Sequence, residues 1–566
     1  MKITSIPLFT ATLLAVSTLG AAASVPRAAS VAMPQTVTVP SLKGVRDIGR
    51  AAGVRVDISV ALPYRHGAEL HALLSAQRDA ASPLYRRYLS REQFRNYFSP
   101  DPNAYTRSVL ALRRAGFEVE PFANRTLVHA VADARVAESY FKTTIDRVLE
   151  ASGRLAYANV RPATIPGELG ASTVVGLNSL VIVRAAASER RQPAGLRALA
   201  VSPLFGPDGG FGPVAVAKAE DYPVEHGYMG TGSNVADIFD GAVTDSDVAT
   251  FLHTFGITRT GPRTTTIRVD GGCGSACFDS FSTTLDAEWT LAMAPGASLF
   301  TYQVPALTNG SIADAFNRIA SDDAVNVVNV SFGACEVNFA DALLAIEPLI
   351  AQGASEGIAY ESVAFGGAQL CGIPQLALPM APADLDTVTA VGGSNTVTES
   401  NGKQDFETGY AGSNGGVSLL IPLPVWQAKT PGVMKTGRNV PDLVLPAEVD
   451  GTGPSIYFGG KWVGGSPFIN NAPFAGYLAT VQQMYGLNTP LFNVAPYLYA
   501  TLDKYGYRSK SAAYFTDITL GCNGAVGNKP VCAKHGYDLT TGIGSIAGGY
   551  SLAKSFALGP IQPANR

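Results

Sequence analysis

The sequence predicts an α/β protein with a doubly wound parallel sheet, preceded by a small α+β domain. Short β-branched segments such as NVVNVSF (326–332) and TVTAVGG (387–393) alternate with helical segments such as SFSTTLDAEWTLAMA (280–294). Apolar strands that are bounded by glycine and separated by helices are typical of a parallel sheet buried on both faces. In such a fold we expect the active site at the carboxyl ends of the strands.

Length and composition indicate two folded domains. The 566 residues are too many for one average core, and 46% hydrophobic with 15% charged residues suits well-buried domains. The charge sum is 42 minus 45, or −3, so we expect neither nucleic-acid binding nor a preference for acidic substrates. We expect a monomer.

Residues 1–23 predict a removable signal peptide. Lys2 precedes the apolar run IPLFTATLLAVSTLG, which ends in the small residues 21–23. The alternative is a membrane anchor, but the run is shorter than the ~20 apolar residues that span a bilayer. We therefore expect a secreted or periplasmic protein without stable membrane insertion.

The cysteines predict disulfide bonds, because their number is even and the protein is expected to be exported. Many pairings are compatible with the sequence. Pairing between sequence neighbours would join Cys273 to Cys277, Cys335 to Cys371 and Cys522 to Cys532. A zinc–thiolate site is disfavoured because the first of these pairs has no second pair nearby.

Residues 45–184 predict the α+β domain. Strands are expected at 54–63 and as a pair within 117–134, and helices at 66–79, twice within 88–117, and at 136–150. The turn-rich SPDPN (99–103) is expected to precede a helix over 104–115.

Residues 185–213 predict a linker, because Gly, Pro, Ala and Arg dominate its composition. Arg190, Arg191 and Arg197 would make it a target for a trypsin-like enzyme. An ordinary solvated linker explains the same composition. The second domain then covers 214–560.

Short motifs occur in a characteristic order along the chain. The first domain carries SPLYRRYLSREQFRNYFSP (82–100), LRRAGFEV (112–119) and YANVRPATIPGEL (157–169). The second carries LDAEW (285–289), APGA (294–297), SFGACE (331–336), VGG (391–393), VPD (440–442), DI (517–518) and GYDLTTGIG (536–544). Together they resemble the sedolisin family, the serine-carboxyl peptidases of family S53, with a pro-kumamolisin-type activation domain. The resemblance implies a ferredoxin-like prodomain before a subtilisin-like peptidase domain.

The resemblance implies a serine nucleophile activated by a glutamate, which an aspartate orients from one helical turn further along. That aspartate is retained as Asp286, but Ser282 occupies the position of the glutamate base. Serine cannot act as this base, and its hydroxyl is expected to cap the helix or face solvent. Asp279 is a poor substitute because it would be displaced by about 5 Å, one helix pitch.

The family's oxyanion aspartate is also replaced. The segment SVAFGG (362–367) places Phe365 at that position, and phenylalanine donates no hydrogen bond to an oxyanion. A Ser-His-Asp hydrolase is disfavoured as an alternative, because no G-x-S-x-G elbow accompanies the histidines of the second domain. These histidines are His226, His253 and His535.

The nucleophile position falls in GGSPFINNAPFAG (464–476). Counting back from its Ala-Pro places Ile469 there, and counting forward from its glycines places Pro467 there. The segment is two residues longer than the family's pattern, so Ser466 is kept as an alternative nucleophile. A turn serine beside proline is the preferred interpretation of Ser466.

The resemblance also implies one Ca²⁺ ion. Its ligands would be the carboxylates of Asp517 and Asp538 and the backbone carbonyls of Ile518, Lys534 and Gly536. Oxygen ligands with two carboxylates suit this hard cation.

The segment Ser331-Phe332-Gly333 resembles the strand edge that pairs with a peptide backbone in this fold. A structural turn from strand to loop is the alternative interpretation. Since three of four key positions are substituted, we expect an exported, catalytically impaired or inactive pseudopeptidase that binds peptides or proteins. The alternatives are an active acid serine-type endopeptidase with a non-standard nucleophile, and a structural or decoy surface protein.

Overall fold

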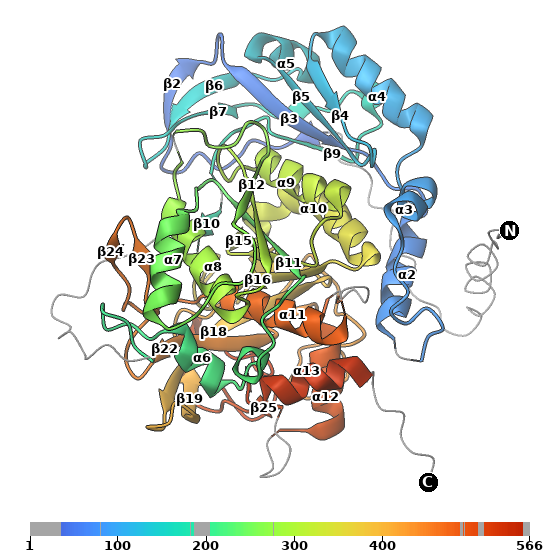
Figure 1. Ribbon diagram of the computed structural model, residues 1–566. Helices are drawn as coiled ribbons and strands as arrows, with labels where there is room; N and C mark the ends of the chain where they lie inside the picture. Colours follow the sequence, from blue (N-terminus) through green and yellow to red (C-terminus); the bar gives the residue numbers. More distant parts are fainter. Residues whose placement is uncertain are drawn as a thin grey trace, which may run out of the picture. The chain divides into compact units, whose positions relative to one another are not determined.

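The computed structural model describes residues 36–79, 81–181, 183–185, 204–275, 277–486, 491, 493–507 and 514–558. The predicted signal peptide and the three arginines of the predicted linker lie outside these residues. Figure 1 shows an N-terminal α+β part and a larger α/β part.

The N-terminal part contains two antiparallel sheets. One has the order β4 (Glu118–Pro121), β5 (Leu127–Asp133), β3 (Arg55–Ala61), β9 (Thr173–Val175), and the other β2 (Arg46–Arg50), β6 (Ile145–Leu149), β7 (Leu155–Asn159). The helices are α2 (Gly67–Arg78), α3 (Arg91–Tyr97), α4 (Pro102–Ala115) and α5 (Ala134–Phe141). On β3, alternate residues Val56, Ile58 and Val60 are fully buried, as expected for a strand with one face in a core.

Two element boundaries differ from the expectation. The predicted helix 136–150 is wrong in its second half: α5 ends at Phe141, Lys142 takes a left-handed conformation with φ 51°, and β6 follows. The β-branched residues after Lys142 favour a strand over another helical turn. Helix α4 starts at Pro102, two residues early, because the Asp101 side chain accepts hydrogen bonds from the next free amides.

The larger part is built on a ten-stranded sheet, which confirms the predicted fold class. Its order is β12 (Thr265–Arg268), β13 (Ser298–Gln303), β11 (Asn234–Phe239), β14 (Val327–Val330), β16 (Ala359–Val363), β18 (Val388–Thr398), β22 (Leu443–Val449), β28 (Ser545–Ile546), β25 (Phe515–Thr516). Neighbours from β12 to β28 are parallel; β25 pairs antiparallel with β28, and β19 (Gln404–Gly409) antiparallel with β18.

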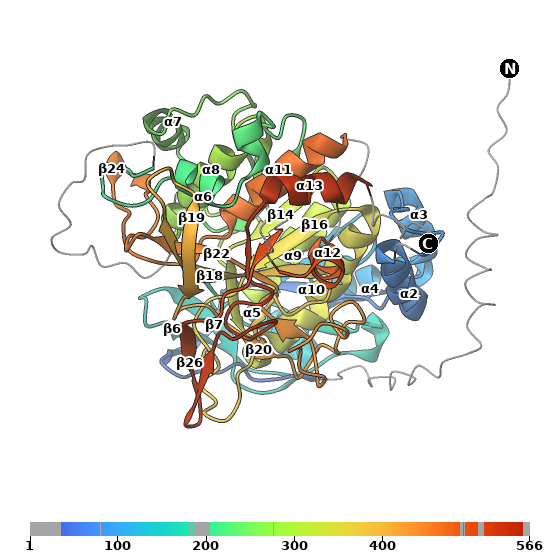
Figure 2. The same cartoon turned by 90° about the horizontal axis from the view of Figure 1, so that it is seen from below.

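Helices cover both faces of this sheet (Figure 2). One face carries α9 (Asn309–Asp322) and α10 (Glu336–Glu356), and the other carries α6 (Pro213–Ala219), α7 (Asp245–Thr254), α8 (Ser280–Met293), α11 (Ala472–Tyr485) and α13 (Gly549–Leu558). Each face has its own hydrophobic core, one around Trp289 and Phe474 and the other around Phe316 and Leu349. Helix α12 (Ala495–Tyr505) packs against the first core.

Short strands complete the fold. They are β1 (Thr36–Val37) with β8 (Ala163–Thr164); β10 (Arg184–Ala185), β15 (Phe332–Cys335) and β17 (Met380–Ala381); β20 (Gly416–Val417) with β21 (Asn439–Val440); β23 (Tyr457–Phe458) with β24 (Lys461–Trp462); and β26 (Cys522–Val526) with β27 (Lys529–Cys532).

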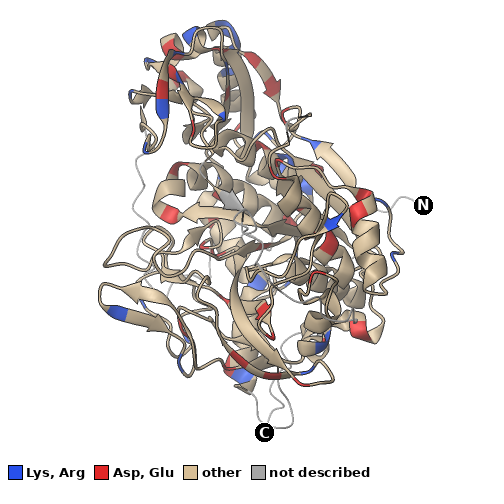
Figure 3. Ribbon diagram, turned by 90° about the vertical axis from the view of Figure 1, so that its left-hand side faces the viewer, with Lys and Arg blue, Asp and Glu red and all other residues tan. Residues whose placement is uncertain are grey.

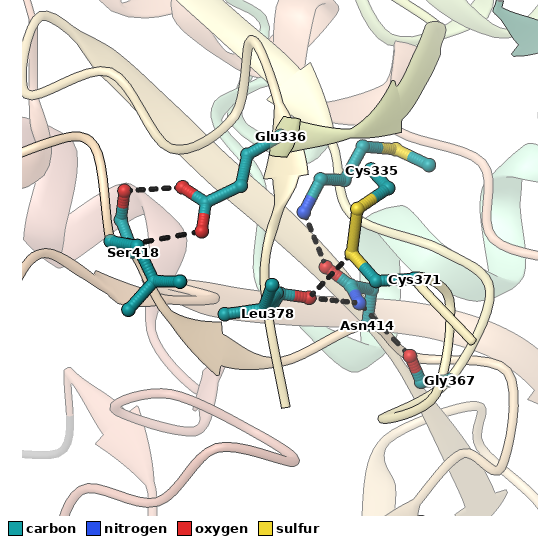
Figure 4. The surroundings of a disulfide bond; sticks show 9 residues. Cys335, Glu336, Gly367, Cys371, Leu378, Asn414 and Ser418 are labelled. Atoms are coloured by element: carbon teal, nitrogen blue, oxygen red, sulfur yellow. Dashed lines mark hydrogen bonds between the residues drawn. A yellow bond between two sulfur atoms is a disulfide. The ribbon is translucent and has the colours of Figure 1, made fainter. Parts of the chain in front are cut away.

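All six cysteines form the three disulfides predicted from sequence neighbours, Cys273–Cys277, Cys335–Cys371 and Cys522–Cys532. Figure 4 shows that Cys335–Cys371 lies beside Asn414. The Asn414 amide donates to the carbonyls of Gly367, at 2.9 Å, and Leu378, at 3.3 Å. The disulfide and this side chain together fix the long loop that follows β16.

Basic and acidic residues are interspersed along the ribbon (Figure 3). Within the described residues, no helix has the length and apolar character needed to cross a membrane.

Candidate active site

Three polar side chains lie next to one another in the centre of the parallel sheet. The strand register pairs Asp237 of β11 with Asn329 of β14, and Asn329 with Glu361 of β16. All three residues are fully buried. Because side chains at paired positions point to the same face, they form a polar row in an otherwise apolar sheet.

Helices α8 and α11 each add one residue to this row. The Asn329 amide uses its two protons to donate to Asp237, at 2.9 Å, and to Asp286 of α8, at 2.7 Å. The amide of Asn471, just before α11, donates to the Asn329 carbonyl oxygen at 2.6 Å and to Glu361 at 3.1 Å. Every amide proton of the two asparagines therefore has an acceptor.

Ser331 completes the network. Its hydroxyl lies 3.0 Å from the side-chain oxygen of Asn471 and also forms a short hydrogen bond with Asp286. A hydroxyl has a single proton. Ser331 donates this proton to Asp286, and the side-chain oxygen of Asn471 is a second possible acceptor.

The environment favours the protonated form of these carboxyls. Burial, followed by the neighbouring Asp237 carboxyl, raises the pKa of Asp286 well above its usual value. Burial also raises the pKa of Glu361 well above its usual value, and that of Asp237 to about 7. The polar row is thus a set of mostly neutral carboxyls tied together by amides.

A narrow pocket opens above this row, and it brings several predicted site residues together. Its lining consists of Ser282, Leu285, Asp286, Ser331, Phe468, Ile469, Asn470 and Asn471. The base position, the orienting aspartate, the nucleophile position and the first residue of the predicted peptide-binding edge all belong to this set.

Ser282 does not adopt the environment expected for it. Its side chain is buried, and within the described residues its hydroxyl has no hydrogen-bond partner. The Asp279 carboxylate caps α8 instead, accepting a hydrogen bond from the Ser282 backbone N–H at 3.0 Å. Because the Asp279 side chain forms this cap, it is a poor candidate for the base that the sequence predicts to be replaced.

Ile469 and Phe365 meet in one apolar cluster. Ile469 is 2% exposed, and Phe365 packs with it among Val363, Met380, Leu370, Tyr410 and Ala447. A Cβ atom added at Gly393 would lie 2.7 Å from Cγ1 of Ile469, so this isoleucine is packed directly against the backbone of β18. The residues at the positions predicted for the nucleophile and the oxyanion donor therefore belong to the same apolar cluster.

Ser466 lies outside the lining of this pocket, in a partly exposed loop. Its carbonyl oxygen would lie 1.9 Å from a Cβ atom added at Gly453, so the two backbones are closely packed. The Asp208 carboxylate accepts a hydrogen bond from the nearby Gly464 N–H at 2.8 Å. These contacts indicate a structural role for the loop that contains Ser466.

The predicted peptide-binding edge is paired with an extended segment of the same chain. Strand β10 runs antiparallel to β15, with Arg184 opposite Gly333 and Ala185 opposite Phe332. On its other side β15 pairs with β17. A Cβ atom added at Gly333 would lie 2.5 Å from Met380, so a glycine is needed for this close approach.

The predicted calcium ligands lie in one C-terminal loop region. Gly536 N–H donates to both oxygens of Asp517 at 3.3 Å, and Lys534 N–H donates to Asp538 at 3.0 Å. Both carboxyls also lie close enough to the Tyr507 hydroxyl to raise its pKa, after the larger effect of burial. Asp538 also accepts hydrogen bonds from the backbone N–H groups of Thr540 and Thr541. Carboxylate and carbonyl oxygens are the ligand type that Ca²⁺ prefers.

Sequence analysis missed Asp237, Asn329, Glu361 and Asn471. Each of the first three is a single polar residue within an apolar strand, namely NVADIF, VVNV and AYESV. Such a residue signals a buried polar contact. The sequence did not reveal that the strand register would place the three side by side.

Comparisons with known proteins agree with this architecture. The pro-kumamolisin activation domain family matches residues 43–180. Sedolisin from Pseudomonas sp. (strain 101) is 28% identical over 531 residues, which cover 88% of this chain and 86% of sedolisin. Kumamolisin from Bacillus sp. (strain MN-32) is 26% identical over 543 residues, covering 87% and 90%.

A solved structure shows the same similarity. Pseudomonas sedolisin, a serine-carboxyl proteinase in complex with two molecules of pseudo-iodotyrostatin, superimposes with a TM-score of 0.51 at 25% identity. The match covers 61% of this chain and 98% of sedolisin. A parallel sheet between two layers of helices, with a pocket at a buried carboxyl network, defines a subtilisin-like peptidase fold. More narrowly, the chain is similar to the sedolisin family of serine-carboxyl peptidases, family S53, over most of its length, and its residues 43–180 match the pro-kumamolisin activation domain.

Proposed function

We propose that this sedolisin-family protein is an exported pseudopeptidase, which binds extended peptide segments and hydrolyses them poorly or not at all. The apolar cluster that contains both Ile469 and Phe365 carries the proposal. It stands where a peptidase of this family needs a nucleophilic hydroxyl and an oxyanion donor. The loss of a cooperative catalytic group costs on the order of 10⁶ in turnover.

The polar groups that remain support the same conclusion. A serine nucleophile needs a base with a free lone pair beside it. Asp286 is held in hydrogen bonds with Asn329 and Ser331, and burial raises its pKa well above its usual value. Ser282 adds no basic group. The one carboxyl in the pocket lining, Asp286, is hydrogen-bonded to Ser331, and Ser331 also contacts Asn471, so we infer that Asp286 is not free to activate a nucleophile at the predicted position.

We expect peptide binding to persist without the catalytic groups, because it depends on main-chain hydrogen bonds. The β10–β15 pairing is an example of an extended segment on the strand edge at Phe332 and Gly333. Main-chain hydrogen bonds of this kind give affinity that does not require a nucleophile. We propose that a peptide ligand binds along this edge in the same orientation as β10.

We further propose that Asp517, Asp538 and the carbonyls of Ile518, Lys534 and Gly536 hold one Ca²⁺ ion. The ion would fix the C-terminal loop, and no step at the pocket passes through it. The donor set supports this assignment because all five groups offer oxygen.

Incubation in acid tests the proposed lack of peptidase activity. The full chain is held at about pH 4, within the titration range of carboxyl groups, with denatured haemoglobin as substrate. We expect neither removal of the N-terminal domain nor peptide release above the buffer control. Cleavage that is abolished by Ser466→Ala or Asp286→Ala would show that the protein is a working endopeptidase.

Binding is tested separately. A peptide-library pull-down with the full chain, before and after limited trypsin treatment of the predicted linker, should enrich extended peptides after treatment, when β10 can leave the edge. Enrichment of no peptide in either sample would favour a structural role at the cell surface.

A further inference from the structure

A second cluster of chemically active side chains lies where the N-terminal part meets the parallel-sheet part. On adjacent strands, Ser59 of β3 is paired with His129 of β5, and Asp57 lies two residues before Ser59 on the same face. From the other part, Asp314 comes from α9 and Asp270 follows β12. Neither domain alone contains the complete cluster.

The three carboxyls converge on one ring nitrogen. Nδ1 of His129 lies 3.0 Å from Asp314, 3.3 Å from Asp57 and 3.7 Å from Asp270. A ring nitrogen carries at most one proton and donates well to one acceptor. A hydrogen bond to Asp314 accounts for one of these contacts and leaves the other two carboxyls facing the same point.

The three separations from the ring nitrogen are close to those between neighbouring ligand atoms of a tetrahedral metal site. With bonds of about 2.0–2.2 Å from zinc to nitrogen and oxygen, neighbouring ligand atoms in a tetrahedron lie about 3.3–3.6 Å apart. The observed separations of 3.0 to 3.7 Å bracket that range. Ligand atoms of Asp57, His129 and Asp314 all lie within 4.8 Å of one another.

Burial and missing partners also indicate a cation. The side chains of His129 and Asp270 are each 9% exposed, and that of Asp314 is fully buried. One carboxylate oxygen of Asp270 is buried and has no hydrogen-bond partner among the described residues. Three carboxyls against one imidazole leave excess negative charge, and buried charge is normally paired or bound to a metal.

We propose that Asp57, His129 and Asp314 bind one divalent transition-metal ion, with Zn²⁺ the best fit and the Asp270 carboxyl beside the site, and that this ion joins the activation domain to the peptidase-like domain. An imidazole ligand favours zinc over calcium or magnesium, which prefer oxygen alone. Ser59 would orient the Asp314 carboxylate, since its hydroxyl lies 2.7 Å from both oxygens. The site is independent of the pocket and of the calcium loop.

The test uses the purified full chain after treatment with a chelator, in excess Ca²⁺ to saturate the C-terminal loop. Zinc titration should reveal one site per chain, and Co²⁺ should give the intense visible bands of tetrahedral coordination. His129→Gln should lower zinc affinity on the order of 100-fold. Asp57→Asn, whose side chain is 39% exposed and therefore tolerant of change, should weaken binding without unfolding the chain.

His226→Gln is the matched control, because His226 pairs at 2.7 Å with a single carboxylate, Asp221, in an exposed position. It should leave zinc binding unchanged. Absence of a stoichiometric site, or zinc binding that survives both His129→Gln and Asp57→Asn, would overturn the proposal and leave a protonated histidine among carboxyls as the explanation.

Discussion

At the scale of single residues, Ile469 decides how the pocket is interpreted. Its side chain is 2% exposed, belongs to the apolar cluster against which Phe365 packs, and lies against the backbone at Gly393. A residue at a working nucleophile position would be accessible to substrate. Ile469 is buried instead, so we expect it to contribute to the stability of the fold as a core side chain does.

We expect Ile469→Ala to lower the free energy of unfolding by about 2–4 kcal/mol, the range for an isoleucine truncated in a well-packed core. Denaturant unfolding measures this change. Val425→Ala is the control, because Val425 is 80% exposed and its loss should alter stability by less than about 0.5 kcal/mol. Equal effects of the two substitutions on stability would contradict the close packing of Ile469.

Spacing in the sequence predicted which residues meet at the pocket, but not their environments. Ser282 and Asp286 share a helix face, so their proximity follows from helical geometry. The burial of Ser282 does not, because it depends on how α11 covers α8. The row from Asp237 to Glu361 depends on strand register, which no local pattern in these parallel strands encodes.

At the scale of elements, long periodic segments were predicted well and short ones poorly. Helix α8 and strand β18 follow from their own hydrophobic patterns. Strand β10 comprises only Arg184–Ala185 and has no strand pattern of its own. It exists because β15 offers an unpaired edge, so it becomes visible only in the tertiary structure.

Calcium removal tests the C-terminal loop as an element. If Asp517 and Asp538 hold Ca²⁺ in the native state alone, a calcium concentration 100 times the Kd stabilises the protein by about 2.7 kcal/mol. We expect EGTA to lower the unfolding temperature and Ca²⁺ to restore it. Asp517→Asn should abolish this calcium dependence.

Asp405→Asn is the control for that experiment, because Asp405 is exposed on β19, away from the loop. It should retain the full response to calcium. If neither EGTA nor added Ca²⁺ changes the unfolding temperature of the unmodified chain, the calcium site is ruled out. The proposal for the pocket is unaffected by that result.

At the scale of the whole molecule, buried carboxyls are the dominant electrostatic feature. Burial is the largest cause that raises the pKa of each member of a set spread through the parallel-sheet part: Glu220, Asp237, Asp240, Glu288, Glu356, Glu361 and Asp384. Composition gave no sign of this, since a net charge of −3 is ordinary. A fold with many protonated carboxyls is suited to acid.

The direction of the pH dependence follows from these shifts. A carboxyl titrates near pH 4 in the unfolded chain, whereas Asp240 titrates at about 6 and Asp237 at about 7 in the folded protein. Between these values the folded state binds more protons than the unfolded state, so stability decreases as pH rises. We therefore expect the free energy of unfolding to be several kcal/mol greater at pH 4.5 than at pH 7.5, since one pKa unit corresponds to about 1.4 kcal/mol.

Denaturant unfolding at the two pH values, in constant excess Ca²⁺, measures this difference. Asp237→Asn provides the matched variant: the amide resembles the protonated carboxyl, and its oxygen can still accept the hydrogen bond from Asn329. The variant should lose stability less steeply between pH 4.5 and pH 7.5, because one titrating group has been removed from the folded state. Stability that increases with pH over this interval would mean that the carboxyl network is ionised and stabilised by cations, and would also weaken the case for a protonated Asp286 in the pocket.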